Sequence, residues 1–178
     1  MSCAGKTTLC EAIRVLLKPR MPELILLDGD VIRAAFGNGL GFSENDRKVQ
    51  IQSIQNMAKV LSDQDAVVLV GALYAHPELL DWNRKNLTSY FEIYVKASMK
   101  LLKERDSKGL YHSNTPNVVG VDIPWREPAS PDMVIDAEEN MAPGDFSSRP
   151  TCYFVSIPLG PLFKTFRFLH VMTTSTAT

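Results

Sequence analysis

A phosphate-binding signal lies at the start of the chain. The run Ala4-Gly5-Lys6-Thr7-Thr8 leads directly into a helical pattern and matches the second half of the Walker A motif, G-x-x-x-x-G-K-[ST]. In that motif, backbone amides at a helix N-terminus hold phosphate oxygens, the lysine contacts the β- and γ-phosphates and the hydroxyl binds Mg²⁺. The first glycine of the motif would fall one position before Met1, with its strand further upstream. A chance Gly-Lys-Thr at a helix start is the alternative.

Two carboxylates follow the next apolar segment. Asp28 ends a strand-like run, Asp30 comes two positions later, and Arg33 lies one helical turn beyond Asp30. Open α/β sheets bind ligands at the carboxyl ends of their strands. Phosphoryl transfer uses such groups, because a carboxylate can orient an acceptor hydroxyl or take its proton, another can hold metal-bound water, and arginine neutralises spread charge. The alternative is an Asx-type helix cap at Asp30 with Arg33 as a surface partner.

Alternating helical and strand patterns would position these residues. We expect helices at 7–17, 43–61, 78–86 and 98–106, and strands at 24–28, 66–73, 90–95 and 133–136. Ser43 with Asp46 three residues later resembles a capping box. Apolar residues repeat on one face of the helix that follows: Ile51, Ile54, Ala58 and Leu61. The order of elements predicts an α/β fold with a parallel sheet flanked by helices.

The composition is that of one soluble globular domain. The 178 residues are 45% hydrophobic and 22% charged, with a formal net charge of −1, which excludes a disordered or collagen-like chain and gives no bulk attraction to nucleic acid. Cys3, Cys10 and Cys152 form neither a disulfide framework nor a metal-ligand spacing, which favours a reducing, cytoplasmic compartment. No secretory signal and no uninterrupted apolar run of ~20 residues is seen, so we expect no membrane partner.

The last part of the chain differs in composition. Beyond Asp145 no acidic residue follows, and the charged residues are Arg149, Lys164 and Arg167. We therefore divide the chain into a domain at residues 1–145 and a tail at residues 146–178. The tail would add a strand or helix over an apolar edge or form an aggregation-prone extension. Its closing Thr-Thr-Ser-Thr-Ala-Thr is expected to be disordered.

An extended set of motifs resembles the adenylylsulfate kinases, P-loop enzymes that phosphorylate the 3′-hydroxyl of adenylyl sulfate. The resemblance covers about residues 2–136, in order and with similar spacing. Its motifs are Gly-Lys-Thr-Thr at 5–8, Leu-Asp-Gly-Asp at 27–30 with Arg33, Leu-Gly-Phe-Ser at 40–43 with Asp46 and Arg47, 91–95, 105–111, 120–122, 127–128 and 131–132. It implies a P-loop NTPase fold with the first strand missing from this chain. It also implies an ATP- and Mg²⁺-dependent kinase of sulfate assimilation that acts on small nucleotides, and it leaves a homodimer open.

Matched positions imply roles for single residues. Lys6 and Asp30 would be catalytic, with Asp30 at the acceptor hydroxyl, and Thr7 and Asp28 would hold Mg²⁺. The ATP site would comprise Ser2, Cys3, Ala4, Gly5, Lys6, Thr7, Thr8 and Arg105. The acceptor would be held by Asp28, Arg33, Phe42, Arg47, Gln50, Leu73 and Lys108. Arg33 and Arg47 would grip its anionic linkage, and Phe42 would stack on its base. Phe42 could instead be a hydrophobic staple, and Arg47 an exposed helix residue.

The chain departs from the family at several positions. Leu73-Tyr74-Ala75 replaces the usual Ile-Ser-Pro, Gln50 replaces the usual asparagine, and Val118-Val119 replaces the second aromatic of the base sandwich. Adenine recognition is therefore an open question. Residues 82–86 are similar to the matching segment of kinases of capsule and sugar modification. A kinase for another nucleotide-linked acceptor is therefore the second hypothesis. Two further hypotheses stay open: a degenerate nucleotide-binding protein without turnover, and an altered gene product.

Overall fold

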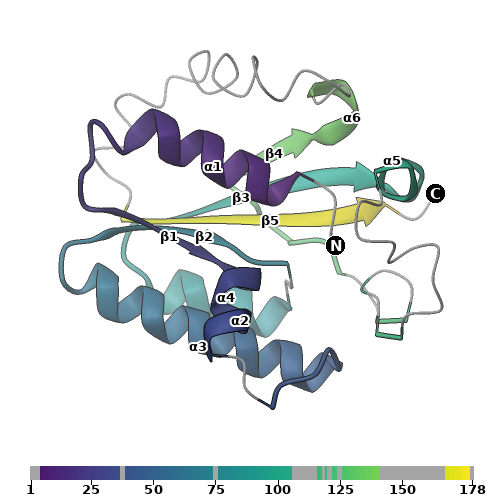
Figure 1. The fold of residues 1–178 in the computed structure, drawn as a ribbon, viewed down its shortest axis with the longest axis horizontal. Helices are drawn as coiled ribbons and strands as arrows, with labels where there is room; N and C mark the ends of the chain where they lie inside the picture. Colours follow the sequence, from purple (N-terminus) through teal and green to yellow (C-terminus); the bar gives the residue numbers. More distant parts are fainter. Residues whose placement is uncertain are drawn as a thin grey trace.

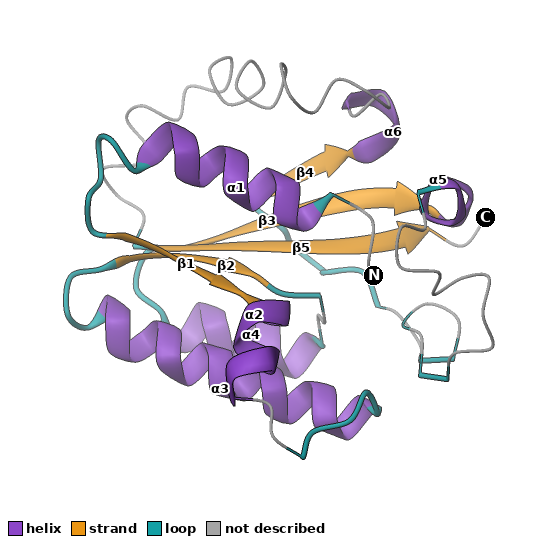
Figure 2. Ribbon diagram, viewed as in Figure 1, coloured by secondary structure: helices purple, strands orange, loops and turns teal. Residues whose placement is uncertain are grey.

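A parallel β-sheet forms the centre of the molecule (Figures 1 and 2). The computed structural model describes residues 5–36, 39–73, 76–105, 116–117, 119, 122–123, 126–140 and 167–176, with backbone only at 139–140 and 173–176. Within these residues the strand order is β1-β2-β5-β3-β4, and every neighbouring pair is parallel. The strands are β1 (Leu24–Asp28), β2 (Val67–Gly71), β3 (Tyr90–Ser98), β4 (Met133–Asp136) and β5 (Phe168–Thr176).

Helices cover both faces of this sheet. They are α1 (Lys6–Leu17), α2 (Gly29–Phe36), α3 (Glu44–Ser62), α4 (Pro77–Asn86), α5 (Met99–Glu104) and α6 (Ala137–Asn140). In Figure 1, α1 and α6 lie above the sheet, α2, α3 and α4 lie below it, and α5 lies at the end toward which β3 and β5 point. Helix α1 begins on that same side, so its N-terminus faces the carboxyl ends of β1 and β2. The expected α/β fold with a parallel sheet is confirmed.

Helix α3 follows the pattern expected from the sequence. Ser43 Oγ accepts a hydrogen bond from the Asp46 amide at 3.2 Å, so the capping start is confirmed. Ile51, Ile54 and Ala58 are buried on the face that packs against β2. The burial of this apolar stripe fixes the rotation of the helix about its axis, and with it the direction of the polar residues near its start.

Strand β5 lies between β2 and β3, at the centre of the sheet. The tail adds a strand, which is one of the expected alternatives, but this strand lies at the sheet centre and not over an edge. Residues 173–176, expected to be disordered, belong to the strand, and residues 177–178 lie outside the described residues. Side chains 168–172 are at most 5% exposed. A central parallel strand is buried on both faces, and the short apolar run Phe168-Leu169-His170-Val171-Met172 satisfies that requirement except at His170.

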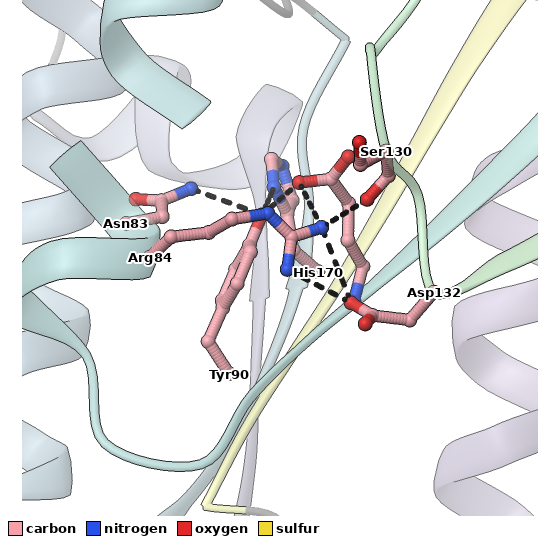
Figure 3. A network of polar contacts seen from close by, with 7 residues as sticks. Asn83, Arg84, Tyr90, Ser130, Asp132 and His170 are labelled. Carbon is pink, nitrogen blue, oxygen red and sulfur yellow. Dashed lines mark hydrogen bonds and ion pairs between the residues drawn. The ribbon is translucent and has the colours of Figure 1, made fainter. Parts of the chain in front are cut away.

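A network of polar side chains compensates for burying His170 (Figure 3). Tyr90 Oη donates to Glu92 Oε2 at 3.0 Å, lies 3.1 Å from His170 Nδ1 and accepts from Asn83 Nδ2 at 3.2 Å. These residues come from β3, β5 and α4, so the network joins the central strand to the helix that covers it. Tyr90 and Phe168 also contact each other, with ring centroids 5.4 Å apart.

Arg84 lies at the solvent side of the network. Its guanidinium lies 3.4 Å from Glu92 Oε2 and 3.3 Å from Asp132 Oδ2, and it donates to the Ser130 carbonyl. Asp132 in turn accepts from the Glu92 amide at 2.8 Å. In Figure 3, Asn83 and Arg84 approach Tyr90 from one side, and Ser130 and Asp132 lie on the other. The loop before β4 is thereby tied to the start of β3.

The hydrogen bonds of Tyr90 favour one tautomer of His170. Tyr90 has a single hydroxyl proton, which goes to Glu92, so the bond between Tyr90 and His170 requires the proton on His170 Nδ1. His170 Nε2 is then an acceptor, and it is buried with no hydrogen-bond partner among the described residues. Burial, and secondarily the charge of Lys6, lowers the pKa of His170 to about 4, so the ring is neutral at pH 7.

This histidine should make stability depend on pH. The pKa of His170 is 6.5 in the unfolded chain and about 4 in the folded chain. The stability that is present above pH 6.5 is therefore lost as the pH falls toward 4. On lowering the pH from 7 to 4, the wild type should lose roughly 2 to 3 kcal/mol more unfolding free energy than His170→Asn, which keeps the Nδ1-like donor. Urea unfolding at several pH values measures this.

The comparison with the variant isolates His170 from its neighbours. Burial raises the pKa of Glu92, which gives an opposing slope, but that slope is present in both proteins. Parallel stability curves for the wild type and His170→Asn would contradict the assignment of a buried neutral imidazole.

Candidate functional site

Three side chains meet where α1 begins and β1 and β2 end. Lys6 Nζ donates to the Gly71 carbonyl at 2.9 Å and lies 3.7 Å from Asp28 Oδ2. Thr7 Oγ1 donates to the same carboxylate oxygen at 3.2 Å. Gly5 precedes the helix with φ 89°, a conformation that favours glycine. Lys6, Thr7 and Asp28 therefore form one cluster, called here the lysine cluster, although Asp28 lies a whole helix and strand away from the other two in sequence.

Asp28 divides its two carboxylate oxygens between two tasks. Oδ1 accepts from the amides of Asp30 and Val31 at 2.9 and 3.3 Å, which caps α2. Oδ2 faces Thr7 and Lys6. The alternative of a helix cap at Asp30 is therefore wrong, because the capping side chain belongs to Asp28. The cap also holds the carboxylate in one orientation, which aims Oδ2 at α1.

Gly71 also belongs to this cluster, although no sequence motif points to it. Its carbonyl holds Lys6, and a Cβ atom at this position would lie 3.0 Å from Cys10 Sγ and 3.5 Å from Lys6 Nζ. The lysine can thus approach β2 only because residue 71 has no side chain. The available sequence signal is a glycine that directly follows the apolar run Val67–Val70 at the end of a strand.

A second cluster surrounds the Phe42 ring. The guanidinium carbons of Arg33 and Arg47 lie 4.9 and 5.5 Å from the ring centroid, within the range of cation–π interaction. Arg33 donates to the Gly41 carbonyl at 2.7 Å, and Arg47 donates to the carbonyls of Phe42 and Asn117 at 3.0 and 2.9 Å. Phe42 is 56% exposed, and position N4 of α3, which a hydrophobic staple would contact, is Arg47 and not an apolar residue. We call this group the arginine cluster.

The remaining predicted site residues lie at different places. Asp30 and Thr8 are exposed at the first turns of α2 and α1, and Leu73 and Arg105 are half-buried after β2 and at the end of α5. Gln50 lies one turn beyond Arg47 on α3 and is 5% exposed, and its Nε2 has no hydrogen-bond partner among the described residues. Four predicted residues lie outside the part of the chain that the structure describes: Ser2, Cys3, Ala4 and Lys108.

The donor atoms of the lysine cluster suit a hard cation together with phosphate. A threonine hydroxyl and a carboxylate oxygen, 3.2 Å apart, are the protein ligands typical of Mg²⁺, which keeps most of its coordination for water and phosphate oxygens. Across the described part of the chain, no three His, Cys, Asp or Glu side chains gather as a metal site. The same residues contain no helix long and apolar enough to cross a membrane.

The two tasks of Asp28 can be separated by substitution. Asp28→Asn keeps an oxygen that can cap α2, whereas Asp28→Ala removes the cap. We expect the alanine variant to be less stable than the asparagine variant by about 1 kcal/mol, the usual value of an N-cap. Urea unfolding of both variants measures the difference, and equal stabilities would show that the Asp28 cap contributes nothing.

Comparison with known proteins identifies the relatives of this chain. The family model described as Adenylylsulphate kinase matches residues 1–136. An adenylyl-sulfate kinase of Staphylococcus carnosus is 36% identical over 146 residues, which cover 79% of this chain and 73% of the relative. A cytidine diphosphoramidate kinase of Campylobacter jejuni is 38% identical over 137 residues, 75% of this chain and 79% of the relative.

Solved structures agree on the fold. The structure of a Mycobacterium tuberculosis APS kinase in complex with AMPPNP and APS superposes with a TM-score of 0.70. The superposition covers 87% of this chain and 91% of that chain at 24% identity, so it supports the P-loop NTPase fold alone. Together with the family match over residues 1–136, the sequence relatives establish that this chain belongs to the adenylylsulphate kinase family.

Proposed function

We propose that this protein transfers the γ-phosphoryl group of ATP to the 3′-hydroxyl of adenylyl sulfate. The observation that carries the proposal is the lysine cluster, because Lys6, Thr7 and Asp28 meet at the N-terminus of α1. A helix N-terminus attracts phosphate through its unpaired amides and its dipole. Membership of the family indicates the reaction, and the cluster provides groups suited to it.

Lys6 is the residue best suited to hold the phosphates. Its side chain is 11% exposed, and its ammonium group is held by one backbone carbonyl and one carboxylate oxygen. These contacts place the positive charge at the end of β2, beside the N-terminus of α1. Electrostatic positioning of this kind supplies most of the catalysis in phosphoryl transfer.

Thr7 and Asp28 are the residues that would hold Mg²⁺. When bound, the ion neutralises charge on the transferring phosphoryl group. The chain's own contribution is orientation, because the α2 cap fixes Asp28 and the first turn of α1 fixes Thr7. Asp28 therefore links the folding of α2 to the geometry of the phosphate site.

Asp30 would act on the acceptor. Its backbone amide donates to Asp28, and its side chain is exposed in the first turn of α2. In the transfer, the bond from the γ-phosphorus to its bridging oxygen breaks, a bond to the acceptor oxygen forms, and the hydroxyl proton passes to Asp30. The arginine cluster and Gln50 would hold the anionic linkage and the base of the acceptor.

Removing the Lys6 ammonium should strongly weaken ATP binding. We expect Lys6→Ala to bind Mg·ATP at least a hundredfold more weakly in isothermal titration calorimetry, because the variant loses the side-chain cation of the lysine cluster. Lys59→Ala is the matched control, since Lys59 is a lysine on α3 whose ammonium pairs with the exposed Asp63. Equal ATP affinities in the wild type and Lys6→Ala would exclude Gly5 to Thr7 as the phosphate site.

A cytidine-linked acceptor is the second candidate. Phe42 is 56% exposed and offers an aromatic ring, but Val119 is 2% exposed and pairs with Ile123, so it offers no second aromatic face to a base. The relative described as a cytidine diphosphoramidate kinase is as similar to this chain as the adenylyl-sulfate kinase is. Both acceptors share an anionic linkage next to a nucleoside, which the arginine cluster suits equally well.

Weak discrimination between the two bases should follow. Stacking on an aromatic is worth ~1 to 3 kcal/mol per base, so loss of one face costs roughly tenfold to a hundredfold in affinity. We expect adenylyl sulfate to compete with cytidine diphosphate analogues for the ATP-loaded protein with less than a thousandfold preference. A larger preference for adenine would restrict the protein to adenylyl sulfate, and the reverse preference would favour the cytidine-linked acceptor.

A further inference from the structure

The strand beside the phosphate-binding helix comes from a distant part of this chain. The phosphate-binding motif consists of a strand, a glycine-rich loop and a helix in direct succession. Here Gly5 and Lys6 open α1, but the strand that lies beside α1 at the sheet centre comes from residues 168–176. Helix α1 contacts β1, β2 and β5. Strand β5 thus occupies the place of the strand that leads into the loop in this motif.

The register of the sheet places β5 level with the lysine cluster. Gly71, whose carbonyl holds Lys6, pairs with Asp28 of β1 on one side and with Val171 of β5 on the other. The row Asp28–Gly71–Val171 therefore contains the candidate Mg²⁺ ligand, the carbonyl that holds Lys6 and a residue of β5. Any displacement of β5 would move this row.

Beyond that row the strands have different lengths. Strands β1 and β2 end at Asp28 and Gly71, whereas β5 continues to Thr176 and stays paired with β3 as far as Ser98. The extension spans five residues, or roughly 16 Å at the rise of a strand. Among the described strands, none pairs with its other edge. That edge therefore presents backbone amides and carbonyls on the side where α1 begins (Figure 1).

Strand β5 is also firmly held in the sheet. Its paired residues run along both β2 and β3, and Arg167 just before it donates to the Asp65 carbonyl at 2.9 Å. His170 joins the polar network on the α4 side. Without β5, the β1–β2 pair that carries Asp28 and Gly71 would share no paired strand with β3 and β4.

We propose that the phosphate site is assembled from both ends of the chain, with β5 acting as the strand of the phosphate-binding motif. Its segment Met172–Thr176 forms one wall of the site opposite Gly5 to Thr7, and ATP binding depends on it. This inference rests on the proposed function. It assigns a nucleotide-binding role to the part of the chain that lies outside the family match at residues 1–136.

Hydrogen–deuterium exchange on the full chain tests the proposal. Mg·ATP should slow exchange at amides 5–9 and also at amides 172–176, and Lys6→Ala should abolish both effects. Exchange in the second half of α3, far from both chain ends, serves as the internal reference. If calorimetry shows ATP binding while exchange at 172–176 is unchanged, the proposal is overturned but the proposed function stands. If the unaltered chain binds no ATP, both are overturned.

A matched pair of substitutions separates a role in binding from a role in folding. Val171 and Val68 are both fully buried in central strands, but only Val171 lies in the row of Gly71, whereas Val68 pairs with Phe168 at the other end. At temperatures where both variants are folded by circular dichroism, Val171→Ala should weaken Mg·ATP binding at least tenfold and Val68→Ala less than twofold. Equal affinities in the two variants would overturn the proposal.

Discussion

The parallel pairing of β5 with β2 and β3 is the interaction on which the rest of this structure depends. It joins a half that carries Asp28 and Gly71 to a half formed by β3 and β4. Backbone groups at the centre of a sheet are buried, and each one left unpaired costs about 1 to 3 kcal/mol. Strand β5 therefore decides whether the five strands form one sheet or whether β1–β2 and β3–β4 remain two separate pairs. The lysine cluster lies at the ends of β1 and β2, and Gly71 of this cluster pairs with Val171 of β5.

Burial of His170 and Glu92 shows how the sheet accommodates polar side chains at its centre. A buried polar group is tolerated when it is hydrogen-bonded, and the single hydroxyl of Tyr90 contacts both Glu92 Oε2 and His170 Nδ1. The resulting network is directional, since the hydroxyl proton can serve only one acceptor. Such a network would favour one register of β5, because a shift by one residue would move His170 to the opposite face of the sheet.

Most of the first 136 residues can be predicted from the sequence, since the apolar runs and helical repeats carry strong local signals. The strand at Leu24–Asp28 and the cap at Ser43 agree with the prediction because both depend on neighbours in sequence. The prediction misplaces strand β5 because a run of five buried residues fits an edge or a centre equally well, and only its partners decide. The alternative of an α2 cap at Asp30 fails for a similar reason, because the sequence does not show which of the two carboxylates accepts from the α2 amides.

Only some residues of the candidate site could be predicted from the sequence. Lys6, Thr7 and Asp28 follow from motifs, whereas Gly71 and Asn117 act through carbonyl oxygens, which no residue type reveals. Such oxygens help to fix the cations of both clusters: Gly71 holds Lys6, Gly41 holds Arg33, and Asn117 holds Arg47. A neutral carbonyl dipole orients a cation without cancelling its net charge, so these contacts fix the positions of the cations without neutralising them. For Lys6, the nearby Asp28 carboxylate offsets part of the charge. The backbone conformation of the strand ends and loops therefore sets the electrostatics of the site as much as the side chains do.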